Sequence, residues 1–216
     1  MSNVDSARSD GPLVGVLLAA GRGSRFDALG HNNKLLALVD GQAVAVQSAA
    51  NLRAHVDHLI IVIKPNSSAL RQAFSDLDVQ ISECADAEQG MGHSLAHGIA
   101  LAQRLFAPRA VLLALADMPY IRSDTLSRLA TRARPDTIAS SAEPATSRII
   151  AAPRFAGQRG HPVLFGNQHF DALMASRGDT GASQLLRSPD VQWLDVADVG
   201  VIRDIDRPSD LLDPQK

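Results

Sequence analysis

The chain has 216 residues, 45% of them hydrophobic, and carries a formal net charge of −2 with a pI near 6.4. These values favour a single domain over residues 13–216 and exclude a general nucleic-acid binder, so any phosphate must be recognised by a local cluster of charge. The single cysteine, Cys84, excludes an intrachain disulfide and a cysteine-based zinc site, which is typical of a cytoplasmic protein.

Residues 1–12 are rich in Ser, Asp and Gly and lack the apolar core of a signal peptide, so we expect a disordered terminus. No apolar run elsewhere approaches the roughly 20 residues that span a bilayer, and we expect no contact with a membrane. From residue 13 onward, short β-rich apolar runs alternate with longer segments of helical periodicity. We expect strands at Leu13–Leu18, Leu59–Ile63, Val79–Ser82, Ala110–Leu115 and Thr137–Ser140, and helices at Val44–His55, Ser67–Phe74, Gly92–Leu105 and Ser123–Ala133.

This alternation predicts a three-layer, Rossmann-like α/β fold, in which a mostly parallel sheet is covered by helices on both faces and ligands lie at the carboxyl ends of the strands. The pattern changes after Ser147, where two strands joined by a glycine-containing link predict a small antiparallel flap. The expected elements are the flap strands Ile149–Pro153 and Pro162–Phe165, helices at Gln168–Ala175 and Ala182–Arg187, strands at Val191–Asp195 and Val201–Ile205, and a last helix from Pro208.

The first expected strand leads directly into a loop of small residues that contains Arg22 and Arg25, with Lys34 nine residues further on. Small residues allow backbone N–H groups to approach phosphate oxygens, and the arginines add charge-assisted donors. A dinucleotide-binding fingerprint would need glycine or alanine where Phe26 stands, and the Gly-Lys-Ser/Thr of a P-loop never occurs. The loop is therefore either another kind of phosphate-binding loop or an ordinary turn between a strand and a helix.

The segment Leu18-Ala19-Ala20-Gly21-Arg22-Gly23-Ser24-Arg25, followed by Lys34, resembles the signature of a nucleotidyltransferase superfamily. The resemblance implies that Leu18, Ala19, Ala20, Gly21 and Gly23 offer backbone contacts to a triphosphate. It also implies that Arg25 and Lys34 neutralise phosphate charge. The sequence departs from many relatives in the long link 26–33 between the arginine and the lysine.

Acidic residues occur at two places that suit a metal. Asp117 follows the apolar run Ala110–Leu115, where a parallel sheet presents catalytic groups, and a carboxylate there can hold Mg²⁺. The alternative is a cap for the helix near Ser123, although Ser123 itself is a nearer cap. Within a strand, Asp204 and Asp206 would face the same side.

Leu115-Ala116-Asp117-Met118-Pro119 and Asp204-Ile205-Asp206 resemble the metal-binding segments of the superfamily, which implies a Mg²⁺ site made of Asp117 and Asp206. Arg207 replaces the threonine that usually follows. Taken alone, the second segment suits a helix cap by Asp206 before Pro208 equally well.

The glycines of 90–94 open an expected helix whose free N–H groups can face a ligand. By resemblance, Gly90, Met91 and Ser94 contact the nucleobase. Gln158-Arg159-Gly160-His161-Pro162 and Gly178-Asp179-Thr180-Gly181-Ala182 resemble segments of the molybdenum cofactor cytidylyltransferases, which implies acceptor-binding roles for Arg159, His161 and Asp179. Taken alone, the two segments favour a surface hairpin turn and a capped helix, although the second also suits an acceptor phosphate.

The resemblance implies an enzyme that transfers CMP from CTP to the terminal phosphate of molybdopterin and releases pyrophosphate, with Mg²⁺ as the cofactor. Arg25, Lys34 and the metal would neutralise the charge on the phosphates. The product would pass to a molybdoenzyme or to its chaperone. Alternatives are a related enzyme that uses GTP or another phosphorylated acceptor, and a non-catalytic chaperone that binds nucleotide or cofactor.

Overall fold

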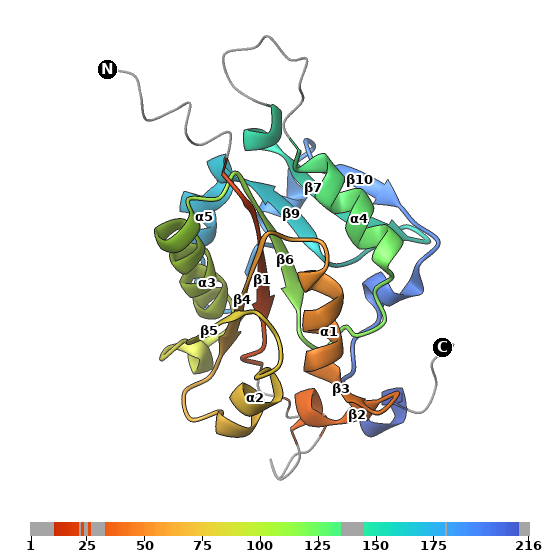
Figure 1. Ribbon diagram of the computed structural model, residues 1–216. Coiled ribbons are helices and arrows are strands. Elements are labelled where there is room, and N and C mark those ends of the chain that lie inside the picture. The colour runs from red at the N-terminus through yellow and green to blue at the C-terminus, as the bar shows by residue number, and fades with distance from the viewer. Residues whose placement is uncertain are drawn as a thin grey trace.

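A computed structural model describes residues 11–21, 23, 26, 33–134, 145–179 and 181–211. Its centre is an eight-stranded sheet in the order β10-β7-β9-β6-β1-β4-β5, with β8 paired to β7 (Figure 1). The strands are β1 Leu13–Leu18, β4 His58–Ile63, β5 Gln80–Glu83, β6 Ala110–Leu115, β7 Ile150–Phe155, β8 Gln158–Arg159, β9 Val163–Gly166 and β10 Gln192–Asp195. A separate hairpin consists of β2 Leu38–Val39 and β3 Gln42–Ala43.

The parallel core of the sheet follows from its apolar runs. Strand β1 is buried along its whole length and lies between β6 and β4, parallel to both. Strand β5 continues the sheet in parallel beyond β4. Continuous burial on both faces is what an internal parallel strand needs, and the predicted mostly parallel α/β fold is confirmed.

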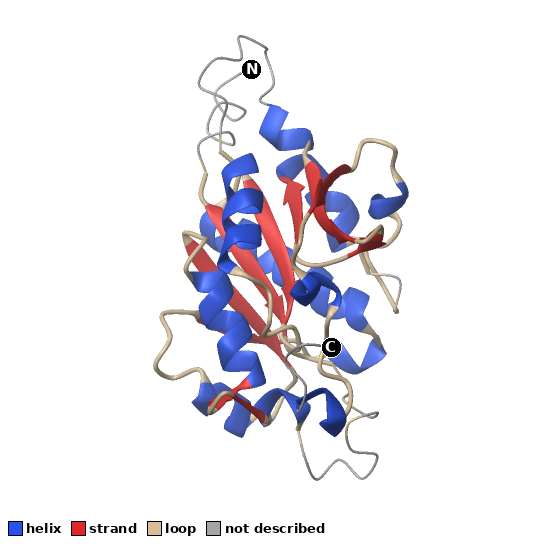
Figure 2. Cartoon of the chain, turned by 90° about the vertical axis from the view of Figure 1, so that its right-hand side faces the viewer, coloured by secondary structure: helices blue, strands red, loops and turns tan. Residues whose placement is uncertain are grey.

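Helices cover both faces of this sheet, as Figure 2 shows from the side. Helices α1 Val44–Arg53, α2 Ser68–Ala73 and α4 Ser123–Arg132 pack on one face; α3 Met91–Phe106 and α5 Phe170–Met174 pack on the other. Successive β1 residues alternate between the two cores, with Leu17 facing α1 and Val16 facing α3. Gly98 allows α3 to lie close to β1, because a Cβ there would stand 2.7 Å from Cγ1 of Val16.

The two strands of the predicted flap pair antiparallel with each other, and β9 also pairs antiparallel with β6. The flap is therefore a continuation of the main sheet. The expected strand at Thr137–Ser140 lies outside the described residues. The expected helix at Ala182–Arg187 is only a 3₁₀ turn at Leu185–Arg187, and the helix expected from Pro208 is a 3₁₀ turn at Pro208–Leu211.

The expected strand at Val201–Ile205 is wrong. Residues Val199–Ile202 form a 3₁₀ turn because the Asp198 side chain accepts the Gly200 N–H at 3.0 Å. The N–H of Ile205 then donates to the main-chain oxygen of Asp117 at 2.8 Å instead of joining a ladder. Among the described residues, no helix is long and apolar enough to cross a membrane.

Candidate active site

The parallel strands deliver their loops to one edge of the sheet, and the pairing continues just past the strand ends. The N–H of Ala19 donates to the oxygen of Val62 at 2.8 Å, and the N–H of Ala116 donates to that of Leu18 at 3.0 Å. The loops after β1 and β6 therefore start from fixed positions. Asp117 follows one residue after this anchor.

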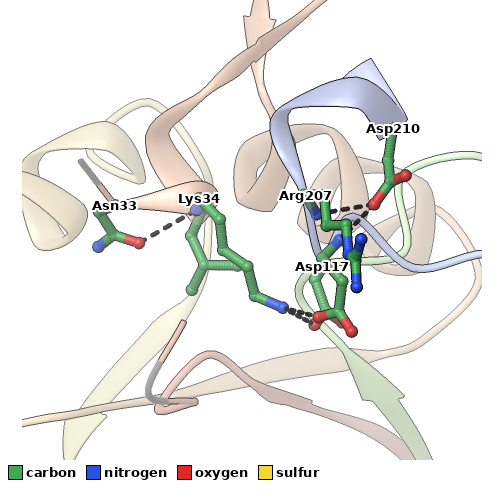
Figure 3. Close-up of polar contacts among 7 residues, drawn as sticks. Asn33, Lys34, Asp117, Arg207 and Asp210 are labelled. Carbon is green, nitrogen blue, oxygen red and sulfur yellow. Dashed lines mark hydrogen bonds and ion pairs between the residues drawn. The ribbon is translucent and has the colours of Figure 1, made fainter. Parts of the chain in front are cut away.

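Lys34 is the basic residue of this edge. It begins the 3₁₀ turn Lys34–Leu36, which Asn33 caps by accepting the N–H of Leu35 at 3.0 Å. Its Nζ lies 2.7 Å from Oδ2 of Asp117 and 2.9 Å from Oδ1 of Asp206 (Figure 3). Burial alone would lower the pKa of Lys34, but the two carboxylates outweigh it and raise the pKa above its usual value. The side chain is therefore an ammonium held by two anions.

Asp117, Asp204 and Asp206 each place a carboxylate oxygen within 4.8 Å of the others. Burial raises the pKa of Asp204, and the charges of Asp206 and Asp117 add to this effect. One oxygen of Asp117, Oδ1, is buried and has no hydrogen-bond partner among the described residues. Three convergent carboxylates, one with an unused buried oxygen, fit a divalent cation that prefers oxygen ligands.

Sequence reasoning assigned only two of these acids to the metal. The spacing predicts that Asp204 and Asp206 share a face in a strand, but the resemblance implies a metal-binding role for Asp206 alone. The segment is irregular, yet both carboxylates reach Asp117. The two-residue spacing of Asp204 and Asp206 was thus a sequence signal for the third acid. The hydrogen bond from the N–H of Ile205 to the oxygen of Asp117 holds this segment beside Asp117.

A first cavity of about 310 Å³ opens beside the lysine. It brings together residues predicted to bind nucleotide from three separate segments, along with Asp117 and the expected acceptor residue Asp179. The predicted nucleotide residues on its wall are Leu18, Ala20, Gly21, Lys34, Gly90, Met91 and Ser94. Ala19 and Gly23 are not among the lining residues, and Arg25 lies outside the described residues.

The start of α3 is locked to the loop that carries Asp179. The N–H of Gly92 donates to the oxygen of Gly178 at 2.7 Å, and a Cβ at Gly92 would stand 2.8–2.9 Å from the backbone of Arg177. The N–H of His93 donates to the oxygen of Gly90. The expectation that the N–H groups of this helix end are free for a ligand is therefore wrong for Gly92 and His93.

A second cavity of about 270 Å³ adjoins the first and shares Leu18, Met91, Leu115 and Asp179 with it. The three residues predicted to bind the acceptor, Arg159, His161 and Asp179, all line it. His161 precedes the cis peptide bond to Pro162, and its N–H donates to the oxygen of Val201 at 2.8 Å. Burial lowers the pKa of its imidazole, although the Asp117 charge and the backbone of Leu113 oppose this shift.

Comparison with known proteins identifies the group to which this chain belongs. The model of the MobA-like NTP transferase domain family matches residues 15–195. The purine catabolism protein PucB of Bacillus subtilis is 29% identical over 208 residues, which cover 92% of this chain and 93% of that protein. Nicotine blue oxidoreductase of Paenarthrobacter nicotinovorans is 31% identical over 198 residues, which cover 90% and 92%.

Another relative is a probable molybdenum cofactor guanylyltransferase of Haloferax mediterranei, 28% identical over 138 residues, which cover 63% of this chain and 62% of that protein. Among solved structures, Rv0371c of Mycobacterium tuberculosis superposes with a TM-score of 0.73 and 26% identity, over 93% of this chain and 95% of that one. The same protein in complex with manganese superposes with a TM-score of 0.65 and 25% identity, over 86% and 88%. The chain therefore belongs to the MobA-like NTP transferase domain family and is a nucleotidyltransferase.

Proposed function

We propose that this protein transfers CMP from CTP to the terminal phosphate of molybdopterin and releases pyrophosphate. The observation that carries this proposal is the arrangement of the two cavities. They share one wall, and Lys34 and Asp117 lie on the side of the first. A triphosphate in the first cavity and a phosphorylated acceptor in the second would meet at the Lys34–carboxylate cluster.

This reaction requires that the two substrates are positioned and that the negative charge of their phosphates is neutralised. An oxygen of the acceptor phosphate forms a new bond to the α-phosphorus, and the bond to the β-phosphate oxygen breaks with its electron pair on pyrophosphate. Because the attacking phosphate is already anionic, no basic side chain is required and no covalent enzyme intermediate arises. Lys34 would neutralise the charge of the phosphates, and we assign the same role to Arg25.

Asp117, Asp204 and Asp206 would hold Mg²⁺ at this point. The metal would supply Lewis-acid stabilisation of the phosphate oxygens. The manganese complex of Rv0371c supports a divalent cation in this fold. The choice of Mg²⁺ rests on the carboxylate ligands and on the resemblance of the motifs.

Three further observations support the choice of acceptor and of base. Arg159, His161 and Asp179 line the second cavity together, which supports the proposal of an acceptor site there. The Haloferax relative bears a name in molybdenum cofactor metabolism. Cytidine is favoured by the Leu-Ala-Ala-Gly form of the loop at residues 18–21.

The deciding experiment incubates the purified protein with α-labelled CTP, isolated molybdopterin and Mg²⁺. We expect pyrophosphate release together with label on the acceptor. Asp117→Ala should reduce kcat by at least about a hundredfold without loss of the folded state, because it removes a metal ligand at the strand end. Binding of both ligands without pyrophosphate release by the wild type would instead identify a non-catalytic carrier.

A further inference from the structure

Residues 198–206, which we call the C-terminal strap, contact both the acceptor side and the metal side of the site. We propose that the buried carboxylate of Asp198 is a positioning residue that anchors the strap and so sets the spacing between His161 and the acids Asp204 and Asp206. This role, which concerns both the acceptor residue His161 and the metal-binding acids, rests on the function proposed above. Asp198 itself is assigned no contact with substrate or metal.

Asp198 is only 2% exposed and is anchored at the start of α4. Its Oδ2 accepts the N–H of Arg122 at 3.0 Å and the hydroxyl of Thr125 at 2.7 Å, while Oδ1 accepts the N–H of Gly200 at 3.0 Å. The first two donors belong to the helix end, and the third belongs to the strap. The sequence predicts Ser123 as the cap of α4, whereas Arg122 occupies the cap position and donates its N–H to a carboxylate more than seventy positions away. An anion there is also favoured by the helix dipole.

The strap then meets the acceptor turn. The oxygen of Val201 accepts the N–H of His161 at 2.8 Å, and any side chain at Gly160 would overlap Val201. The turn that presents Arg159 and His161 to the second cavity is thus seated directly on the strap.

The strap also meets the loop that follows β6. Gly200 lies so close to Tyr120 that a side chain would overlap its backbone, and the guanidinium of Arg203 lies 4.2 Å from the centre of the Tyr120 ring. Ile205 donates its N–H to the oxygen of Asp117, and its fully buried side chain packs with Val39 and Val44. The two acids on either side of Ile205 therefore depend on the same anchored segment as His161.

Replacement of Asp198 by Asn tests this link with little change of shape. An amide has one acceptor oxygen, so its NH₂ group must face either Gly200 or the pair Arg122 and Thr125. A buried donor then lacks its acceptor, and the anchored turn must shift. A shift at this end moves the strap against both His161 and the carboxylates, because the contacts of the strap are continuous.

The experiment measures two constants on Asp198→Asn: the dissociation constant of Mn²⁺ without nucleotide, from the resonance signal of free Mn²⁺, and the KM for molybdopterin. We expect both to rise together by about fivefold or more. Thr125→Val, which removes a single donor, should move both in the same direction by less. It also keeps the test open if Asp198→Asn does not fold.

The matched control is Asp57→Asn. Asp57 accepts the N–H of Leu13 at 2.7 Å at the beginning of β1, the end of the strand far from the site. The Asp57→Asn variant should have a lower melting temperature, while its Mn²⁺ dissociation constant and its KM for molybdopterin stay within about twofold of the wild-type values. If Asp198→Asn and Thr125→Val also lose only stability, the positioning role is overturned. If the wild type transfers no CMP to molybdopterin, the proposed function is wrong, and the Mn²⁺ constants alone decide the role of Asp198.

Discussion

At the residue scale, the central feature is that Lys34 and a divalent cation would bind the same carboxylates. Its Nζ contacts Oδ2 of Asp117 at 2.7 Å and Oδ1 of Asp206 at 2.9 Å, and these acids belong to the three-carboxylate cluster. Two cations so close together repel each other strongly where little water screens them. Metal binding should therefore turn Lys34 away from the carboxylates, toward the cavity whose wall it already forms.

This competition gives a prediction with two opposite signs. Lys34→Ala should lower the dissociation constant of Mn²⁺ by about tenfold in the absence of nucleotide, because three acids lose their competing cation. The same variant should lose about a hundredfold in kcat, because the triphosphate loses a neutralising charge. Mn²⁺ titration and pyrophosphate release measure the two effects.

Lys64→Ala serves as the control, since Lys64 follows β4 and lines neither cavity. It removes the same charge and should leave the Mn²⁺ constant unchanged. Weaker Mn²⁺ binding by Lys34→Ala would mean that the lysine organises the carboxylates and does not compete for them.

The sequence indicates which residues form this site better than it indicates which of them contact one another. Lys34, Asp117 and Asp206 were predicted to act together on phosphate and metal, and their side chains lie within ion-pair distance. The direct pairing of Lys34 with both acids could not be predicted, because the three residues are brought together only by the tertiary fold. The contact between Lys34 and Asp206, for example, spans 172 positions of the chain.

At the element scale, the strands of the sheet could be predicted from the sequence, whereas the 3₁₀ turn of the strap could not. The predicted bounds of strands β1 and β6 are confirmed. Both are short, continuous apolar runs, as expected for parallel strands that are buried on both faces. The strap also contains apolar residues, but the side chain of Asp198, directly before them, closes their 3₁₀ turn by accepting the N–H of Gly200. Periodicity gives no sign that this carboxylate is also held by Arg122 and Thr125, more than seventy positions away.

The junction of α3 with the loop of Asp179 gives a prediction in which two effects oppose each other. Gly92→Ala should stabilise the helix by up to about 1 kcal/mol through propensity. The added Cβ would, however, stand 2.8–2.9 Å from the backbone of Arg177, which cannot yield as the end of a side chain can. We expect the packing effect to win, with a lower melting temperature and a higher KM for both substrates, since Met91 and Asp179 line both cavities.

Gly98→Ala tests the same opposition elsewhere on α3. Its Cβ would stand 2.7 Å from Cγ1 of Val16 in the core beneath the helix. It should reduce stability while both KM values remain those of the wild type, measured by thermal unfolding and by initial rates of pyrophosphate release. If Gly92→Ala behaves in the same way, the contact between α3 and the loop of Asp179 has no part in substrate binding.

At the scale of the whole molecule, the sheet separates two cores and the site draws on both. The first cavity is lined by Leu18, Ala20 and Ser94, on the side of α3. Lys34 enters from the other side, next to Leu35, which belongs to the core beneath α1. A third cluster, in which Ile205 packs with Val39 and Val44, fastens the hairpin β2–β3 to the strap. The carboxylates and the lysine thus come from segments that are held together by the core beneath α1 and by the cluster that joins the hairpin β2–β3 to the strap.

Nucleotide choice tests the whole arrangement, because under the proposed function the base would be read by loops from different parts of the fold. The part of the first cavity that we propose for the base contains Ala20 and the segment Gly90–Met91, which would offer mainly backbone groups to the base edge. Cytosine presents an amino donor and a carbonyl acceptor, whereas guanine is larger and reverses part of that pattern. Each buried polar group left unpaired by the wrong base costs roughly 1–3 kcal/mol.

We therefore expect kcat/KM for CTP to exceed that for GTP by at least about tenfold with molybdopterin as the acceptor. Initial rates of pyrophosphate release at saturating Mg²⁺ measure the ratio, and UTP is the matched control because it has the size of CTP but replaces the amino donor with a carbonyl. UTP should also be a poor substrate if the amino group is read. The name of the Haloferax relative makes GTP the principal rival. Equal rates, or a preference for GTP, would refute the choice of cytidine and leave the nucleotidyltransferase class unchanged, because the roles proposed for Lys34 and the three carboxylates concern the phosphates and not the base.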